Sequence, residues 1–497
     1  TRAVLVMLGF HLSMVSSMLS AIVTVVGVAA VIHVIVRFRE ARGDGRDRRA
    51  ALIHAASLLA IPIVWASSTD AAGFASLLAA HVGPVRDFGV MMAVGSLLVV
   101  VSIALLVPGL ALIGRFDPDP RRAWGEGRLE AGLRRALSGA VRRPIAVTVI
   151  ALLVTGLTAV GLRRTQVETD FTRNFRRDSP IVQAYALIET RLGGAAVWDV
   201  IVPAPATLDW PYLAKILRLE DDLRAKVTGL TKVISLADLV RAGAPRDLAR
   251  IRFGRRMLTS AGLRGIRKRM PTFYQAVYSE DPRSPGQYYL RIMLRCHERQ
   301  TASERQALIA AVDRIAHRHF PEAQVTGLFV LLTSLVESMV RDQWTTFSVA
   351  VVSIALMMTV AFRSPRLALF ALLPNALPIV MVTGTMGWFG LKINMGAAMI
   401  AAVSMGLSID SSIHYIAAYR RARRRGLAPA EVLDGVQQTV GRAVWFSTLA
   451  LIVGFSSLCF SQFVPTITFG VLVSLSMLGG LVGNLLILPL LLRYLGP

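Results

Sequence analysis

A carboxylate and an imidazole stand one helical turn apart in a stretch of the chain that is otherwise apolar. Residues 405–426 read MGLSIDSSIHYIAAYRRARRRG, which places Asp410 and His414 ahead of five arginines. An aspartate at the centre of a membrane helix costs about 2.5–3.5 kcal/mol on insertion, so it normally faces the bundle interior. A carboxyl there can take up and release protons, and His414 lies on the same helix face. Asp410 is therefore the candidate proton carrier; the alternative is that it only hydrogen-bonds neighbouring helices.

Other polar side chains in apolar stretches complete a candidate proton relay. Asp70, in WASSTDAAGF, is a second buried carboxylate. We hypothesise that it meets Asp410 and titrates with it as a coupled pair; the alternative places Asp70 near the outer surface beside water. For His414 and His33, a shared packing or hydrogen-bonding role is equally open. The full candidate set is Asp410, His414, Asp70, Ser411, Thr448, Ser67 and His33.

Long uncharged runs indicate a membrane protein. The 497 residues are 54% hydrophobic and only 17% charged, and a bilayer-spanning helix needs about 20 apolar residues. Backbone groups in lipid must bond to one another, so each span is expected to be helical. The predicted spans are residues 12–36, 56–80, 88–113, 144–162, 343–362, 367–389, 393–419, 443–461 and 466–492.

The net charge of +24 lies mainly in alternate connections between these spans. Loops rich in Lys and Arg stay in the cytoplasm, and some of these arginines are expected to touch anionic lipid headgroups. Nucleic acid is not expected as a partner. The arginine-rich connections are residues 37–49, 115–143, 363–366 and 420–442, which places residues 163–342 outside the cell.

The chain repeats itself at a constant offset of 381 residues (414 − 33). The offset aligns His33 with His414, Ser67 with Thr448, and Gly9–Met14 with Gly390–Met395. It predicts two parallel halves, as in many transporters. Ala29 stands where the second half has Asp410, and Asp70 is the proposed replacement. The offset also predicts about 240 further residues ahead of residue 1, and so twelve helices and two external domains in all.

The polar segment 163–342 alternates strands and helices, which predicts an α+β domain with a split ferredoxin-like arrangement. Strands are expected at 197–202, 232–235, 288–294 and 323–329, and helices at 212–227 and 302–320, with a helical stretch at 250–272. His297, His317 and His319 lack the spacing of a metal site, and Cys296 and Cys459 are not expected to pair. No catalytic constellation, cofactor site or metal site is predicted, so an enzyme is not expected.

The predicted organisation has five parts. They are residues 1–113 (last three membrane helices of the first repeat), 114–143 (cytoplasmic linker), 144–162 (first membrane helix of the second repeat), 163–342 (external porter domain) and 343–497 (last five membrane helices).

Residues 362–426 carry the motifs FRS…LPN.LPI and G…ID..IH…YR, and the chain closely resembles the resistance–nodulation–division (RND) superfamily. It is most similar to the branch of MMPL and sterol-sensing-domain-like exporters, as the C-terminal part of a twelve-helix protein. In that family an aspartate in the tenth helix takes part in proton relay, and Asp410 occupies the similar position. The matching fourth-helix acid is Ala29 here, and the Tyr that often follows the aspartate is Ser411.

The resemblance implies an exporter of hydrophobic or amphiphilic molecules, often lipids, that is driven by the proton motive force. It implies a multi-pass protein of the bacterial inner (plasma) membrane whose partners are the lipid bilayer, protons and the substrate, assembled as a monomer or a homo-oligomer. The alternative function is a sterol-sensing-type receptor or regulator without net transport; a structural or assembly subunit is a third interpretation.

Overall fold

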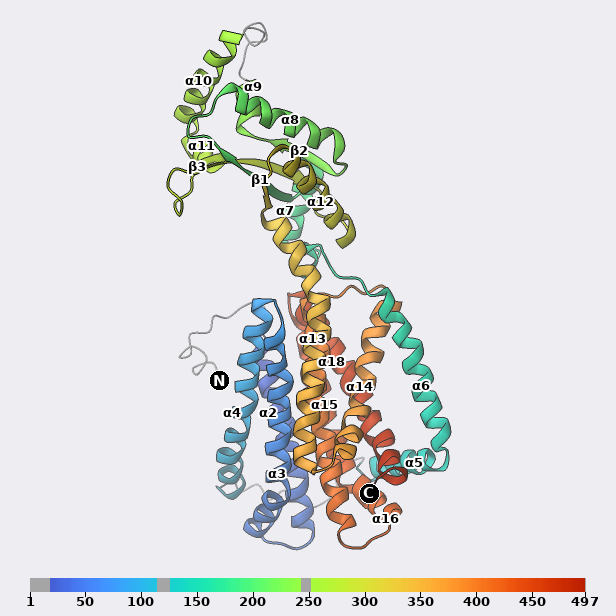
Figure 1. The fold of residues 1–497 in the computed structure, drawn as a ribbon. Coiled ribbons are helices and arrows are strands. Elements are labelled where there is room, and N and C mark those ends of the chain that lie inside the picture. Colours follow the sequence, from blue (N-terminus) through green and yellow to red (C-terminus); the bar gives the residue numbers. More distant parts are fainter. Residues whose placement is uncertain (1–17, 114–125, 243–251, 497) are drawn as a thin grey trace. The chain divides into compact units, whose positions relative to one another are not determined.

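The computed structural model describes residues 18–113, 126–242 and 252–496. The chain forms two compact units, each described by itself: residues up to Val167 together with Ser338 onward, and Glu168–Glu337. Some of the predicted features lie outside the described residues. They are the repeat partner Gly9–Met14, the start of the predicted span 12–36 and much of the linker 114–143. The first unit is helical, and the second contains the sheet (Figure 1).

Nine helices in the described residues are long and apolar enough to cross a membrane, which confirms the predicted spans with shifted ends. They are α2 (Leu19–Gly43), α3 (Arg48–Ala75, extended by η2, Ser76–Ala79), α4 (Gly83–Ile113), α6 (Pro144–Gly161), α13 (Leu328–Phe362), α14 (Pro365–Trp388), α15 (Met395–Arg423), α17 (Arg442–Ser456) and α18 (Val464–Val482). Shorter elements adjoin them: α5 (Glu126–Arg142), η3 (Leu162–Arg164), α16 (Pro429–Val436), η6 (Gln437–Gly441), η7 (Ser457–Phe460), η8 (Gly483–Ile487) and α19 (Leu488–Tyr494).

The ends of the key helices follow from local sequence. Asn394 caps α15 by accepting a hydrogen bond from Ala397 N at 2.9 Å, and Asp47 caps α3 by accepting one from Ala50 N at 3.1 Å. A side-chain oxygen at this position satisfies an N–H group that lacks a partner within the helix. Gly426 follows α15 with φ of 81°, a left-handed conformation that glycine adopts without strain.

Helix α15 is the most buried of the nine spans, with 89% of its apolar window inside the protein. It packs against α3, α14 and α18, while α2 packs against α17. At the α3–α15 crossing a Cβ on Gly73 would lie 2.8 Å from Gly406 Cα, so only glycine permits this approach. This close packing places polar groups on every face of α15 among other helices rather than in lipid.

The second unit contains a small antiparallel sheet with strand order β2-β4-β1-β5, and β3 pairs with β4. The strands are β1 (Ala196–Ala204), β2 (Leu230–Ile234), β3 (Tyr278–Glu280), β4 (Tyr288–Cys296) and β5 (Gln324–Thr326). The helices are η4 (Phe171–Asn174), α7 (Pro180–Arg191), α8 (Trp210–Lys226), α9 (Leu236–Ala242), α10 (Arg252–Arg269), α11 (Pro271–Val277) and α12 (Ala302–His319). The long central pair, β1 and β4, runs through nine residue pairs, including Val200 opposite Ile292.

Alternating side chains of β1 and β4 form the core of this unit with α8 and α12. Trp198, Val200, Leu213 and Val312 are fully buried, which is the pattern expected where one face of a sheet is covered by helices. The predicted strands at 197–202, 232–235 and 288–294 and both predicted helices are present. The predicted strand 323–329 is too long, because α13 begins at Leu328. The strand β3 and the helix α7 were not anticipated.

Candidate functional site

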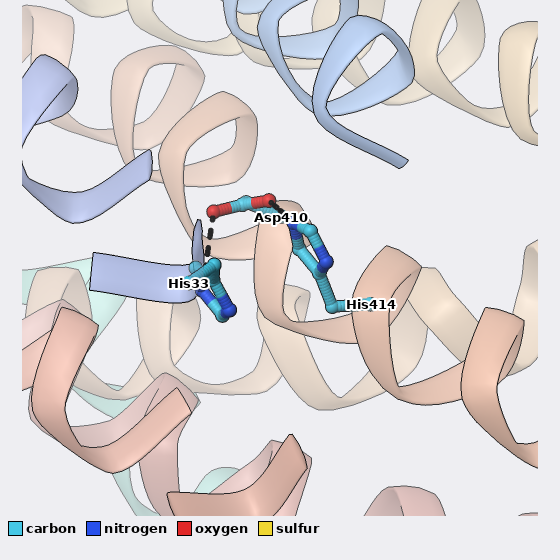
Figure 2. Close-up of side chains that lie close together, drawn as sticks. All are labelled: His33, Asp410 and His414. Carbon is cyan, nitrogen blue, oxygen red and sulfur yellow. Dashed lines mark ion pairs between the residues drawn. The ribbon is translucent and has the colours of Figure 1, made fainter. Parts of the chain in front are cut away.

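Three polar side chains meet in the interior of the helical unit: His33 from α2, and Asp410 and His414 from α15 (Figure 2). His414 Nε2 lies 3.1 Å from Asp410 Oδ1, and His33 Nε2 lies 4.0 Å from Asp410 Oδ2. The carboxylate therefore lies across the Nε2 ends of both imidazoles. His33 and His414 are almost completely buried, whereas the Asp410 side chain is 17% exposed.

The two imidazole rings are stacked, with centroids 4.2 Å apart and planes within 6° of parallel. Two imidazolium ions at this distance would repel by about 4 kcal/mol at an effective dielectric constant of about 20. One positive charge beside one carboxylate is, by contrast, a stable combination. The geometry therefore suits a group that holds a single labile proton distributed over Asp410, His33 and His414.

Asp70 of α3 shares a cavity with Asp410. The cavity has a volume of about 20 Å³. Its polar lining residues are Ser67, Asp70, Asp410 and His414. Asp70 is buried, and its Oδ1 has no hydrogen-bond partner among the described residues. A space of this size accommodates about one water molecule, which could bridge polar groups that do not touch. Ala29, which the sequence offset of 381 aligns with Asp410, lines the same cavity.

Two of the predicted relay residues lie apart from this cavity. Ser411 is buried in α15 and Thr448 is buried in α17, but neither is among the described residues that line it. The structure thus brings together His33, Asp410 and His414 by direct approach. It joins Asp70 and Ser67 to that group through the cavity.

The same three residues are the group, among those described, that could offer ligand atoms to a metal ion: their candidate atoms lie within 4.8 Å of one another. A zinc ion would require Zn–N distances of about 2.0–2.1 Å to each imidazole. It would also lie near the plane of each ring that binds it. An ion shared by two parallel stacked rings lies outside at least one plane, so one ring would have to rotate. The stacked geometry suits proton sharing better than coordination.

Sequence reasoning missed a second polar cluster beside the site. Asn375 of α14 donates to Ser412 Oγ at 2.8 Å, and Asn484 of η8 donates to Asn375 Oδ1 at 2.8 Å. Asn484 Oδ1 also accepts a hydrogen bond from Ser412. All three side chains are buried, and their mutual bonds fix α14 and the C-terminal helices against α15. Asn375 was visible in the LPN.LPI motif, but its partners are distant in sequence.

Comparison with known proteins identifies the family. The model of the MMPL family matches residues 3–147 and 220–497. The chain belongs to the MMPL family. This result confirms the resemblance drawn from the motifs around Asp410, and with the nine apolar helices it makes the chain a multi-pass membrane transporter of the RND type. The bacterial plasma membrane is the usual location of MMPL proteins.

Two relatives illustrate the similarity. The chain is 23% identical over 347 residues to MJ1562 of Methanocaldococcus jannaschii, named as a membrane protein; the match covers 66% of this chain and 84% of that protein. It is 27% identical over 269 residues to MmpL9 of Mycobacterium tuberculosis, named as a probable transport protein; here the match covers 51% of this chain and 27% of the relative. The match thus spans about a quarter of the length of the MMPL transport protein.

Proposed function

We propose that this MMPL protein exports hydrophobic or lipid-like molecules and is driven by protons that bind at Asp410. The observation that carries the proposal is the stacked His33–His414 pair facing Asp410. A buried ionisable residue in a membrane protein generally marks a substrate or proton pathway. The site is built from two helices that belong to different proposed halves, so a change in its charge can act on the packing between them.

The proposal of two parallel halves is supported by contacts that recur at the same offset. Phe74 and Phe88 meet edge to face with centroids 6.3 Å apart, and their counterparts Phe455 and Phe469 do so at 6.2 Å. The 3₁₀ turns Ser76–Ala79 and Ser457–Phe460 also correspond. His33 and His414 are counterparts as well, so their stack would lie on the pseudo-twofold axis.

We further propose that Glu168–Glu337 is an external porter domain with a ferredoxin-like sheet. The β2-β4-β1-β5 order, with antiparallel neighbours and with α8 and α12 each joining two strands, supports that arrangement. Arginine-rich helix ends are expected in the cytoplasm, which supports the proposed external location of this domain. Apolar cargo would reach the domain from the bilayer, which every MMPL protein contacts.

The test is proton-driven flux of a fluorescent phospholipid analogue in vesicles reconstituted with the protein. Asp410→Asn removes the proton-binding carboxylate with little change in shape, and we expect flux to fall at least about tenfold. Asp87→Asn is the matched control, because Asp87 is exposed. Wild-type flux in Asp410→Asn would contradict the proposal. Wild-type flux in Asp70→Asn would remove Asp70 from the relay.

A sterol-sensing-type receptor without net transport is the second candidate function. One observation favours it: Ala29 stands where the second half has its carboxylate, so the pair of acids is incomplete. In that case the purified protein would bind a sterol but show no gradient-dependent flux of phospholipid or sterol.

A further inference from the structure

A second cavity lies on the other side of the histidine pair from Asp70. It also has a volume of about 20 Å³, and His33 and His414 form part of its wall. Arg37 of α2 and Arg421 of α15 are its charged lining residues. The rest of the wall is apolar: Leu58, Leu59, Pro62, Ala417, Ala418, Val440 and Ala443. His414 lines both cavities, so the histidine pair stands between them.

An imidazole is suited to this position because it has two nitrogens. It can accept a proton on one and release a proton from the other. Both histidines present Nε2 to Asp410. A proton taken from Asp410 at Nε2 can therefore leave from Nδ1 by a change of tautomer. Each cavity is large enough for about one water molecule to continue the transfer.

The arginines close the second cavity toward the arginine-rich end of the bundle. Arg421 donates from Nη2 to Leu58 O at 3.1 Å, which fixes α15 to α3. Arg37 donates from Nη1 to Glu40 Oε2 at 2.7 Å, so part of its charge is balanced. No carboxylate lies beside Arg421 among the described residues that line the cavity. The lining residues from α3, η6 and α17 are uncharged. A permanent positive charge here opposes protons that would enter from that side and speeds their departure from an imidazolium.

We infer that protons leave Asp410 through the His33–His414 pair into this second cavity, and that Arg421 is the positioning residue that biases the exit. The inference rests on the proposed proton-driven transport. It assigns the second cavity to the release side and the cavity shared with Asp70 to the uptake side.

The test measures phospholipid flux in vesicles while the pH on the arginine-rich side is varied. Protons on the release side should inhibit flux. With Arg421→Gln we expect half-inhibition at a proton concentration at least about fivefold lower than for wild type, because the repelling charge is gone. Arg421→Lys should restore the wild-type profile. Arg424→Gln, at an exposed position three residues later, is the matched control and should be unchanged.

A second variant, at Ala418, tests the exit without changing Arg421. The test then does not depend on whether Arg421→Gln folds correctly. Ala418→Val fills the cavity and should slow flux by at least about fivefold, whereas Ala422→Val, outside the lining, should not. If Arg421→Gln keeps the wild-type profile and Ala418→Val keeps wild-type flux, the exit is elsewhere. That result is distinct from failure of the proposed function, which would appear as wild-type flux in Asp410→Asn.

Discussion

At the residue scale, the site combines one carboxylate of α15 with a histidine from each of α2 and α15. Under the proposed repeat, the position that would supply a second acid is Ala29, which lines the cavity together with Asp70 and Asp410. A carboxyl on α3 and a carboxyl on α2 could thus reach the same small space. If Asp70 substitutes for the acid missing at Ala29, the carboxyl should support proton-driven flux whether it is carried by α3 or by α2.

We therefore predict that the carboxyl can be moved. Asp70→Ala should reduce proton-driven phospholipid flux at least about tenfold, and the double change Ala29→Asp with Asp70→Ala should recover most of it, since the carboxyl returns to the same cavity. Ala30→Asp with Asp70→Ala is a stringent control because Ala30 lines this cavity too. Recovery only with Ala29→Asp would indicate a specific geometry. If neither change restores flux, the carboxyl is required at position 70 itself and does not compensate for the acid missing at Ala29.

At the element scale, Arg224 joins α8, β2 and α9 in the second unit beside a buried carboxyl, Glu220. Glu220 is fully buried, and its Oε2 lies 3.4 Å from Arg224 Nη2. Arg224 Nη2 also donates to Val233 O at 2.7 Å and to Asp238 Oδ2 at 2.8 Å. Burial raises the pKa of Glu220 from 4.5 to about 8. Arg224 thus holds three elements together while Glu220 remains protonated beside it at neutral pH.

This pKa gives a signed prediction for stability. The folded protein keeps a proton on Glu220 that the unfolded chain loses, so unfolding becomes easier as the pH rises from about 4.5 to about 8. Glu220→Gln cannot ionise, so at pH 9 it should unfold at a higher temperature than wild type by several degrees, with no such gain at pH 4.5. Differential scanning calorimetry of the purified protein provides the measurement, and exposed Glu322→Gln is the control. An equal change at both pH values would show that shape, not charge, is responsible.

At the scale of the whole molecule, α5, α16 and the connections that follow α2 and α15 lie at one end of the helical unit (Figure 1). The sequence is rich in arginine along α5 and at the ends of α2 and α15. Arg442 at the start of α17 links this end together, since it donates to Glu40 of α2 at 2.8 Å and to Glu130 of α5 at 2.9 Å. Each membrane helix takes the chain to the other side of the membrane. Helix ends one crossing away from the arginine-rich end are therefore expected on the opposite side. The proposed topology therefore predicts that residues 168–337 are external.

Labelling of intact cells tests this topology. In a Cys459→Ser background, Glu322→Cys should react with a membrane-impermeant maleimide, because Glu322 is exposed in the second unit. Glu431→Cys, exposed at the start of α16, should react only after the cells are permeabilised. The remaining Cys296 is buried and should stay unlabelled. Labelling of Glu431→Cys alone in intact cells would reverse the assignment.

The membrane class, the nine spans and the core strands of the second unit were predictable from sequence, because each depends on local composition or periodicity. Asp410 and His414 were recognisable for the same reason: four residues on one helix place them on one face. Only the tertiary structure decided that His33 stacks on His414, that Asp70 faces the cavity of Asp410 and that Arg421 closes a second one. Those contacts join helices hundreds of residues apart, and their distances depend on how closely the helices cross. The glycine contact between Gly73 and Gly406 sets one such crossing, and no periodicity along the chain encodes which two helices meet there.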